Sequence, residues 1–152
     1  MTLFFLLRFL HLAAMILWLG GGLSIPAVLD VRRSLALGIG HGEALVARLS
    51  TTTALVIPAG LTTFVTGLGL IFLRGGFGAV PPRIHVAMAM TLAIFGIGAL
   101  LNRPALLSLA AAVKRGDLEE AEAAGRRFTF WVRCEDALRL SILVLMVLPI
   151  GG

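Results

Sequence analysis

The feature that most constrains this chain is an apolar segment, residues 51–73, which holds 23 residues and no charged side chain. The hydrocarbon core of a bilayer is about 30 Å thick, so a helix of about 20 apolar residues crosses it. The rest of the chain suits the same environment: 59% of the 152 residues are hydrophobic, 14% are charged, and the mean hydropathy is +1.00. This composition excludes a water-soluble globular protein and predicts an integral membrane protein.

Three further apolar segments have the length of a membrane span: residues 3–23, 84–101 and 128–150. Four spans and their connections use up the whole length, so we expect a single domain over residues 1–152. The expected fold class is all-α, an integral membrane antiparallel four-helix bundle in contact with the lipid bilayer. The first segment lacks a basic start and contains Arg8, which argues against a cleaved signal peptide.

The connection between the third and fourth spans is expected to be helical. Asn102 and Pro104 mark a break after the third span, and residues 104–127 then read as helical extensions at the membrane surface. Asp117, with Glu120 three residues later, has the spacing of a capping box at a new helix start.

The net charge of +5 indicates membrane orientation rather than nucleic-acid binding, so no nucleic-acid partner is expected. Two connections carry most of the basic residues: Arg32, Arg33, Arg48, Arg103, Lys114, Arg115, Arg126 and Arg127. The opposite side carries only Arg8, Arg74 and Arg83. The positive-inside rule therefore predicts a multi-pass protein of the inner (plasma) membrane with both termini outside the cytoplasm.

Two histidines inside the predicted spans are the candidate cofactor ligands. His11 lies in the first span and His85 in the third, and both are expected near the outer leaflet. The first and third helices of a four-helix bundle lie diagonally across its core, where ionisable residues tend to face inward and mark a functional site. Two imidazoles at one depth can hold a haem iron from both faces. The sequence therefore predicts haem b between these helices, with bis-His or mono-His ligation, whereas a lone Cys134 supports no disulfide or cluster.

Arginines close to both histidines match the propionates of a haem. Arg8 precedes His11 by three residues and Arg83 precedes His85 by two, and guanidinium groups bind carboxylates bidentately. Anchoring at the membrane interface explains either arginine alone equally well.

Methionines leave a copper site open as the alternative. Met15 follows His11 by four residues and Met88 follows His85 by three, so each thioether shares a helix face with its histidine. Such His–Met pairs suit copper(I), although methionine at helical spacing is more often an adaptable packing residue.

The start of the fourth span carries four charges within seven residues. We interpret Arg133 and Asp136 as a solvated helix start, whereas Glu135 and Arg139 lie deeper and are expected to form a buried polar pair between helices.

The first span places a histidine, a tryptophan, a glycine and a proline at a recognisable spacing: His11, Trp18, Gly21 and Pro26. This pattern resembles the first helix of the bacterial haem-binding protoporphyrinogen oxidases of the J type. The likeness continues at Pro58, Thr63, Gly67, His85, Arg127, Phe128, Glu135 and Pro149. The same overall plan is similar to the membrane part of copper-resistance D proteins.

The J-type resemblance implies a haem b site at His11 and His85. It also implies an oxidoreductase acting on protoporphyrinogen IX, but Ala87 stands where that family has a lysine, so we expect weak oxidase activity or none. The expected role is redox chemistry, electron transfer or haem handling, with a porphyrin, a quinone or another redox partner. Small-residue stripes on the helices also predict a homo-oligomer.

Overall fold

The computed structural model describes residues 2–25 and 31–147, and this part of the chain is all-helical without a strand. The longer helices are α1 (Thr2–Ser24), α3 (Ile39–Leu73), α4 (Pro82–Ile97), α5 (Arg103–Arg115) and α6 (Leu118–Val147). The short elements are α2 (Val31–Ala36), the 3-10 turn η2 (Phe77–Ala79) and the π-helical turn η3 (Gly98–Asn102). The all-α prediction is therefore confirmed.

Three helical stretches are long and apolar enough to cross a membrane: α1, α3 and the continuous stretch Pro82–Arg115. Large apolar side chains cover the outside of α1, where Phe9, Ile16 and Leu17 are each more than 60% exposed. An apolar surface of this extent is unfavourable in water and matches lipid chains. The predicted span 128–150 is not among the three, because charged residues interrupt α6, and residues 148–150 lie outside the described part; that span stays a prediction.

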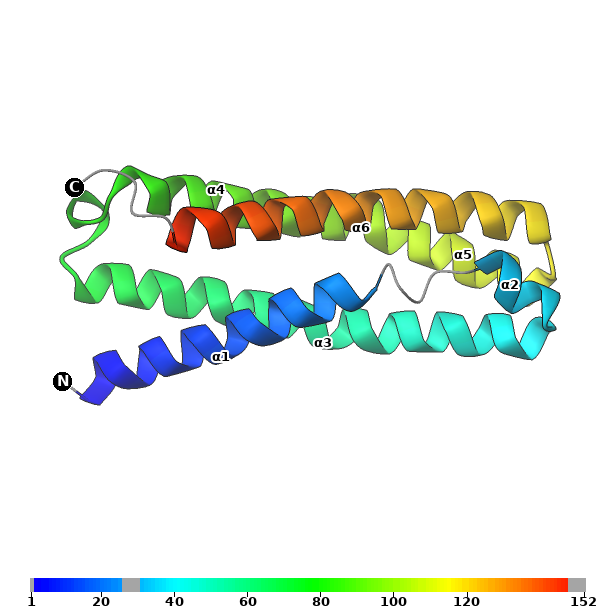
Figure 1. Ribbon diagram of the computed structural model, residues 1–152, viewed down its shortest axis with the longest axis horizontal. Helices are drawn as coiled ribbons and strands as arrows, with labels where there is room; N and C mark the ends of the chain where they lie inside the picture. Colours follow the sequence, from blue (N-terminus) through cyan, green and yellow to red (C-terminus); the bar gives the residue numbers. More distant parts are fainter. Residues whose placement is uncertain (1, 26–30, 148–152) are drawn as a thin grey trace.

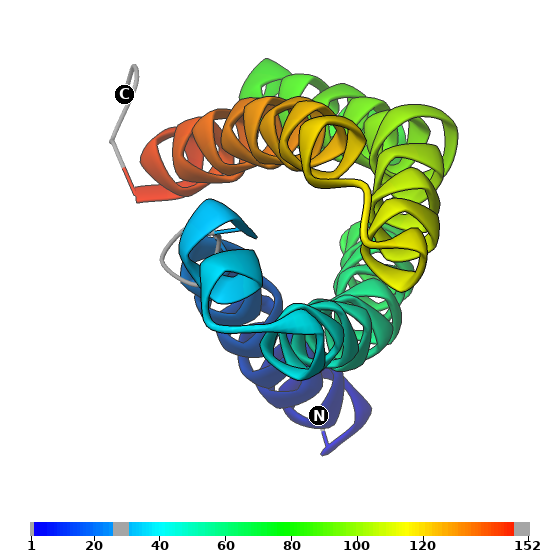
Figure 2. The same ribbon diagram turned by 90° about the vertical axis from the view of Figure 1, so that its right-hand side faces the viewer.

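The helices lie lengthwise side by side, and the chain turns back between α3 and α4 and again between α5 and α6 (Figure 1). Helix α1 packs against α3 and α6, α4 packs against α6, and α5 packs against both α3 and α6. Seen along the long axis, α1 and α4 lie on opposite sides (Figure 2). The end with the N-terminus of α1 also contains the end of α3 and the start of α4 (Figure 1).

The turn between α5 and α6 depends on a glycine followed by an acidic cap. Gly116 has φ +71°, a left-handed conformation that costs glycine little, and its N–H bonds to the carbonyls that end α5. The Asp117 carboxylate then accepts the backbone N–H of Glu120 at 3.0 Å, which caps the start of α6. One half of the expected capping box is therefore present; the other half is not, because the Asp117 N–H bonds to the Ala112 carbonyl and the Glu120 carboxylate pairs with Arg115.

Helix α3 has 35 residues and is about 52 Å long at 1.5 Å per residue, well beyond the thickness of a bilayer core. Its first part packs with α5 and the start of α6 around a core of fully buried side chains: Leu49, Leu109, Val113, Phe128 and Val132. Residues 104–127 are helical as expected, and most belong to this packed end of the molecule.

The expected break at Asn102 and Pro104 is a widened turn rather than an end of the helix. Pro104 has no N–H, and its ring clashes with the carbonyl four residues earlier in a regular helix. Here the N–H of Arg103 bonds to the carbonyl of Gly98, five residues back, so the chain passes through η3 and continues as α5. Asn102 is thereby placed in the interior with 7% of its surface exposed.

Candidate functional site

A cavity of about 260 Å³ lies among α1, α3, α4 and α6 in the half of the molecule that contains the start of α1. Its walls are mostly apolar and aromatic, with a few polar or sulfur-bearing side chains: Arg8, His11, Met15, Thr63, Arg74, Met88, Thr91 and Met146. Mostly apolar cavities with a few convergent polar groups are typical of cofactor and small-molecule sites, which start at about 300 Å³.

His11 presents one ring nitrogen for ligation. Its Nδ1 lies 2.9 Å from the Thr63 carbonyl oxygen and 3.1 Å from the Thr66 hydroxyl oxygen. A carbonyl only accepts, so Nδ1 carries the proton and donates it, which leaves Nε2 with a free lone pair. No described residue bonds to Nε2, and His11 is half-buried in the cavity wall. Metal-bound histidines characteristically donate their second nitrogen to a carbonyl in this way.

Helix α3 is shaped to receive this imidazole. A Cβ atom at Gly67 would lie 3.2 Å from His11 Cε1, so the glycine leaves the space that the ring fills. Thr66 donates its hydroxyl hydrogen to the Thr62 carbonyl at 2.6 Å, so its oxygen is free to accept from His11. The ring is therefore positioned by three residues on about one turn of α3: Thr63, Thr66 and Gly67.

Two arginines lie at one end of the cavity. Arg8 is one turn before His11 on α1, and Arg74 follows the end of α3. The Arg74 guanidinium lies over the Phe4 ring at 5.9 Å from its centroid, a contact that holds the side chain beside α1. Both arginines are exposed, so both can reach an anionic group at the mouth of the cavity.

His85 and Arg83 lie outside this cavity. On α4 the lining residues are Ile84, Ala87, Met88 and Thr91. His85 is exposed and its ring lies 6.0 Å from that of Phe77, on the side of α4 turned away from the lining face. Arg83 is half-buried in the first turn of α4. Of the four predicted site residues, His11 and Arg8 therefore line the cavity together, whereas His85 and Arg83 do not line it.

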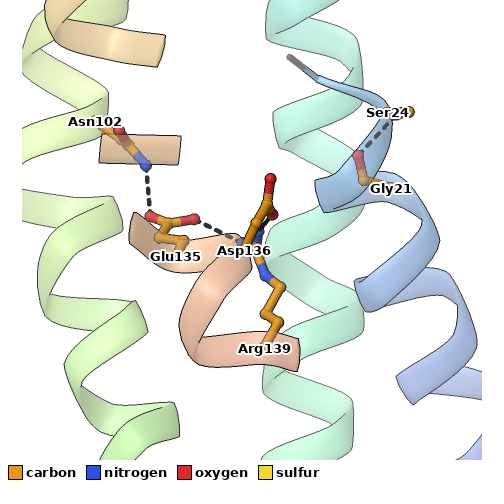
Figure 3. A network of polar contacts seen from close by, with 6 residues as sticks. All are labelled: Gly21, Ser24, Asn102, Glu135, Asp136 and Arg139. Atoms are coloured by element: carbon orange, nitrogen blue, oxygen red, sulfur yellow. Dashed lines mark hydrogen bonds and ion pairs between the residues drawn. The ribbon is translucent and has the colours of Figure 1, made fainter. Parts of the chain in front are cut away.

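A second buried polar group lies in the middle of α6 (Figure 3). Arg139 donates through Nη2 to Glu135 Oε2 and through Nη1 to Asp136 Oδ1, each at 2.6 Å. Asn102 of η3 donates its amide to Glu135 Oε1 at 2.5 Å. The predicted buried pair of Glu135 and Arg139 is confirmed, and Arg133 is exposed as expected.

The prediction that Asp136 is solvated is wrong, because Asp136 is only 7% exposed. Asp136 is buried because α1 covers this part of α6: the Arg139 guanidinium lies against Gly22 and 5.6 Å from the centre of the Trp18 ring. Nearby, Ser24 donates its hydroxyl hydrogen to the Gly21 carbonyl at 2.8 Å and closes the last turn of α1 (Figure 3).

Sequence reasoning missed several residues of the two sites. Arg74 was used only to predict the orientation in the membrane, and Asn102 was predicted only to mark a break in the helix. Thr66 gave a usable signal, because Thr63, Thr66 and Gly67 recur at helical spacing within an otherwise apolar span. Two residues of the family pattern, Pro26 and Pro149, lie outside the described residues.

No protein-family model matches the chain, and no curated protein or solved structure is detectably similar to it. Among the described residues, no group of three histidine, cysteine, aspartate or glutamate side chains is arranged to hold a metal ion. The functional assignment therefore rests on the geometry of the cavity.

Proposed function

We propose that this chain is a haem b-binding membrane protein with a role in redox chemistry, electron transfer or haem handling. The observation that carries the proposal is His11, whose Nδ1 is engaged by the Thr63 carbonyl while Nε2 is left unpaired in an apolar cavity. This arrangement fixes the tautomer and the orientation that an iron ligand needs. Ligation by His11 alone replaces the bis-His arrangement in the proposal, because His85 lies away from the cavity.

The side chains of the cavity wall have the chemistry that a haem needs, but the cavity of about 260 Å³ is smaller than the macrocycle, so binding would require the surrounding helices to move apart. Phe64, Trp18 and the apolar side chains around them exclude water, while Arg8 and Arg74 supply positive charge at the end where propionates would lie. A bound haem b supplies a one-electron couple whose potential depends on the axial ligand and on burial. The chain's own contribution is to hold the ring of His11, to shield it from water and to pair the propionates.

Porphyrinogen oxidation is a weaker proposal. It needs repeated acceptance of protons beside the electron acceptor, which a titratable side chain would provide. At the position where the J-type family carries a lysine, Ala87 is 2% exposed and lines the cavity with a methyl group. We therefore favour electron transfer or haem handling over the oxidase reaction.

Copper handling is the second candidate, because three thioethers line the same cavity as His11. They are Met15 on α1, Met88 on α4 and Met146 on α6. Soft sulfur ligands together with one imidazole suit copper(I).

Titration of the purified protein in detergent distinguishes haem binding from copper binding. If the chain binds haem, haemin is expected to saturate at one per chain with a shift of its main absorption band. Saturable binding of cuprous ion without a specific haemin complex would establish the copper site instead.

We also propose that the chain forms an antiparallel four-helix bundle in the inner membrane, with α6 as the fourth span. The basic residues support this orientation, since the end of the molecule with α2 and the α5–α6 turn carries most of them and the end with Arg8 and Arg74 carries few. Both termini and the mouth of the cavity would then lie on the outer side.

Reporter fusions test this orientation. Alkaline phosphatase fused after Arg115 is expected to be inactive, because the positive-inside rule places the α5–α6 turn in the cytoplasm where this enzyme cannot form its disulfides. A fusion after Gly76, in the α3–α4 connection, is the matched control and is expected to be active. The reverse pattern would place His11 in the inner leaflet and contradict the topology.

A further inference from the structure

The polar network of Asn102, Glu135, Asp136 and Arg139 has an unbalanced charge. Two carboxylates share one guanidinium, so the network carries a net charge of −1 if both acids are ionised. All four residues are buried, with exposures of 2% for Arg139, 6% for Glu135 and 7% for Asp136 and Asn102. An uncompensated charge in such a place is strongly unfavourable, and buried groups commonly avoid it by taking up or releasing a proton.

No second cation balances the network within the described side chains. The parts of α1 that contact Arg139 are Gly22 and Trp18, which are uncharged, and η3 contributes the neutral Asn102. The arginines of neighbouring helices that are described at this end, Arg33 of α2, Arg48 of α3 and Arg103 of α5, are exposed. On α6 itself Arg133 is exposed as well. Arg83 and His85 belong to the start of α4, which lies at the end of the molecule with the N-terminus of α1.

The network also contains buried polar atoms with unused bonding capacity. Asn102 Oδ1 and Arg139 Nε have no hydrogen-bond partner, although both residues are more than nine-tenths buried. The amide of Asn102 faces Glu135 and can form a hydrogen bond with its carboxyl group in two ways. It donates through Nδ2 to an ionised carboxylate, and after a half-turn it accepts through Oδ1 from a protonated one. Asn102 is thus matched to both protonation states of Glu135.

We propose that this network is a binding site for one exchangeable proton, carried by Glu135 between Asn102 and Arg139. Proton uptake turns one carboxylate into a neutral carboxylic acid and leaves one ion pair, Asp136 with Arg139, so the network becomes neutral. A proton fits here better than a metal cation because the polar atoms already lie 2.5–2.6 Å apart and leave no space between them. The inference does not depend on which cofactor the cavity binds.

Infrared spectroscopy of the protein in lipid nanodiscs tests the proposal directly. At neutral pH the wild-type protein is expected to show the C=O band of a protonated carboxyl group, shifted on exchange into D₂O. Glu135→Gln should remove this band because it removes the proton carrier. Asp136→Asn should remove it as well, because with one acid fewer the ionised Glu135 is balanced by Arg139. Both changes preserve side-chain shape and leave the network neutral, so both variants are expected to fold.

Glu122→Gln is the matched control. Glu122 also pairs with an arginine four residues later on α6, at 3.6 Å from Arg126, but the Arg126 side chain is 72% exposed and that of Glu122 is 27% exposed. This variant should keep the band unchanged. The proposal is overturned if the wild-type protein shows no such band, if the band survives both Glu135→Gln and Asp136→Asn, or if thermal stability rises with sodium or potassium while no protonated carboxyl is present. The last result would assign the network to a metal cation.

Discussion

Replacing His11 by alanine is expected to eliminate haem from the purified protein. His11 supplies the only imidazole in the described cavity wall, and its Nε2 is held in place by the bond from Nδ1 to Thr63. Loss of a residue that merely orients a metal ligand costs about 10- to 100-fold in metal affinity, so loss of the ligand itself should cost more than about 100-fold. The measurement is haem bound per chain after purification and after titration with haemin.

The matched control is His85→Ala, which changes the histidine on α4 that is exposed and lies outside the cavity. We expect this variant to bind haem like the wild-type protein and to show an unchanged spectrum. A change in the iron's spin state in His85→Ala would restore the bis-His arrangement and would contradict the proposed single ligand. Retention of haem in His11→Ala would remove His11 from the site.

Replacing Arg139 by glutamine is expected to destabilise the protein by about 3–5 kcal/mol. The change leaves Glu135 and Asp136 buried without their common partner, and breaking a buried ion pair from one side costs about this much. Reversible unfolding in mixed detergent micelles measures the difference in free energy of unfolding. The expected cause is the charge left behind rather than lost packing, since glutamine keeps part of the side-chain stem.

Arg126→Gln serves as the control for this effect. Arg126 pairs with Glu122 on the same helix at the same spacing, but its side chain is 72% exposed. Exposed pairs contribute about 0–1 kcal/mol, so this variant should unfold almost like the wild-type protein. Equal losses in the two variants would show that the network around Arg139 has no special role in stability.

The all-helical fold and the first three apolar segments were predictable because bilayer thickness sets the length of a span. The helix boundaries were harder to predict from the sequence. The second span was expected from residue 51, whereas α3 begins at Ile39, because its polar first part packs against α2 and α5. Pro104 predicted a break, but the π-helical turn before it lets the helix continue. Both differences come from tertiary contacts that local apolar patterns do not encode.

The site was predictable in part. An ionisable residue in an apolar span pointed to His11, and the structure places it in a cavity. His85 carried the same signal, but the face of α4 that turns inward is set by Ala87, Met88 and Thr91 packing toward α6 and α1. Asp136 looked solvated because helical spacing alone does not reveal that α1 covers it. The direction that each side chain faces was therefore not readable from the sequence.

The most direct test of the account is the haem content of the wild-type protein purified from membranes of cells that make haem. The measurement combines the absorption spectrum of the pyridine complex, which identifies the haem type, with the ratios of iron and copper to protein. The proposed haem site predicts haem b at one per chain, with iron in the same ratio and no copper. A folded protein that contains no haem, or that retains copper in place of iron, would contradict it.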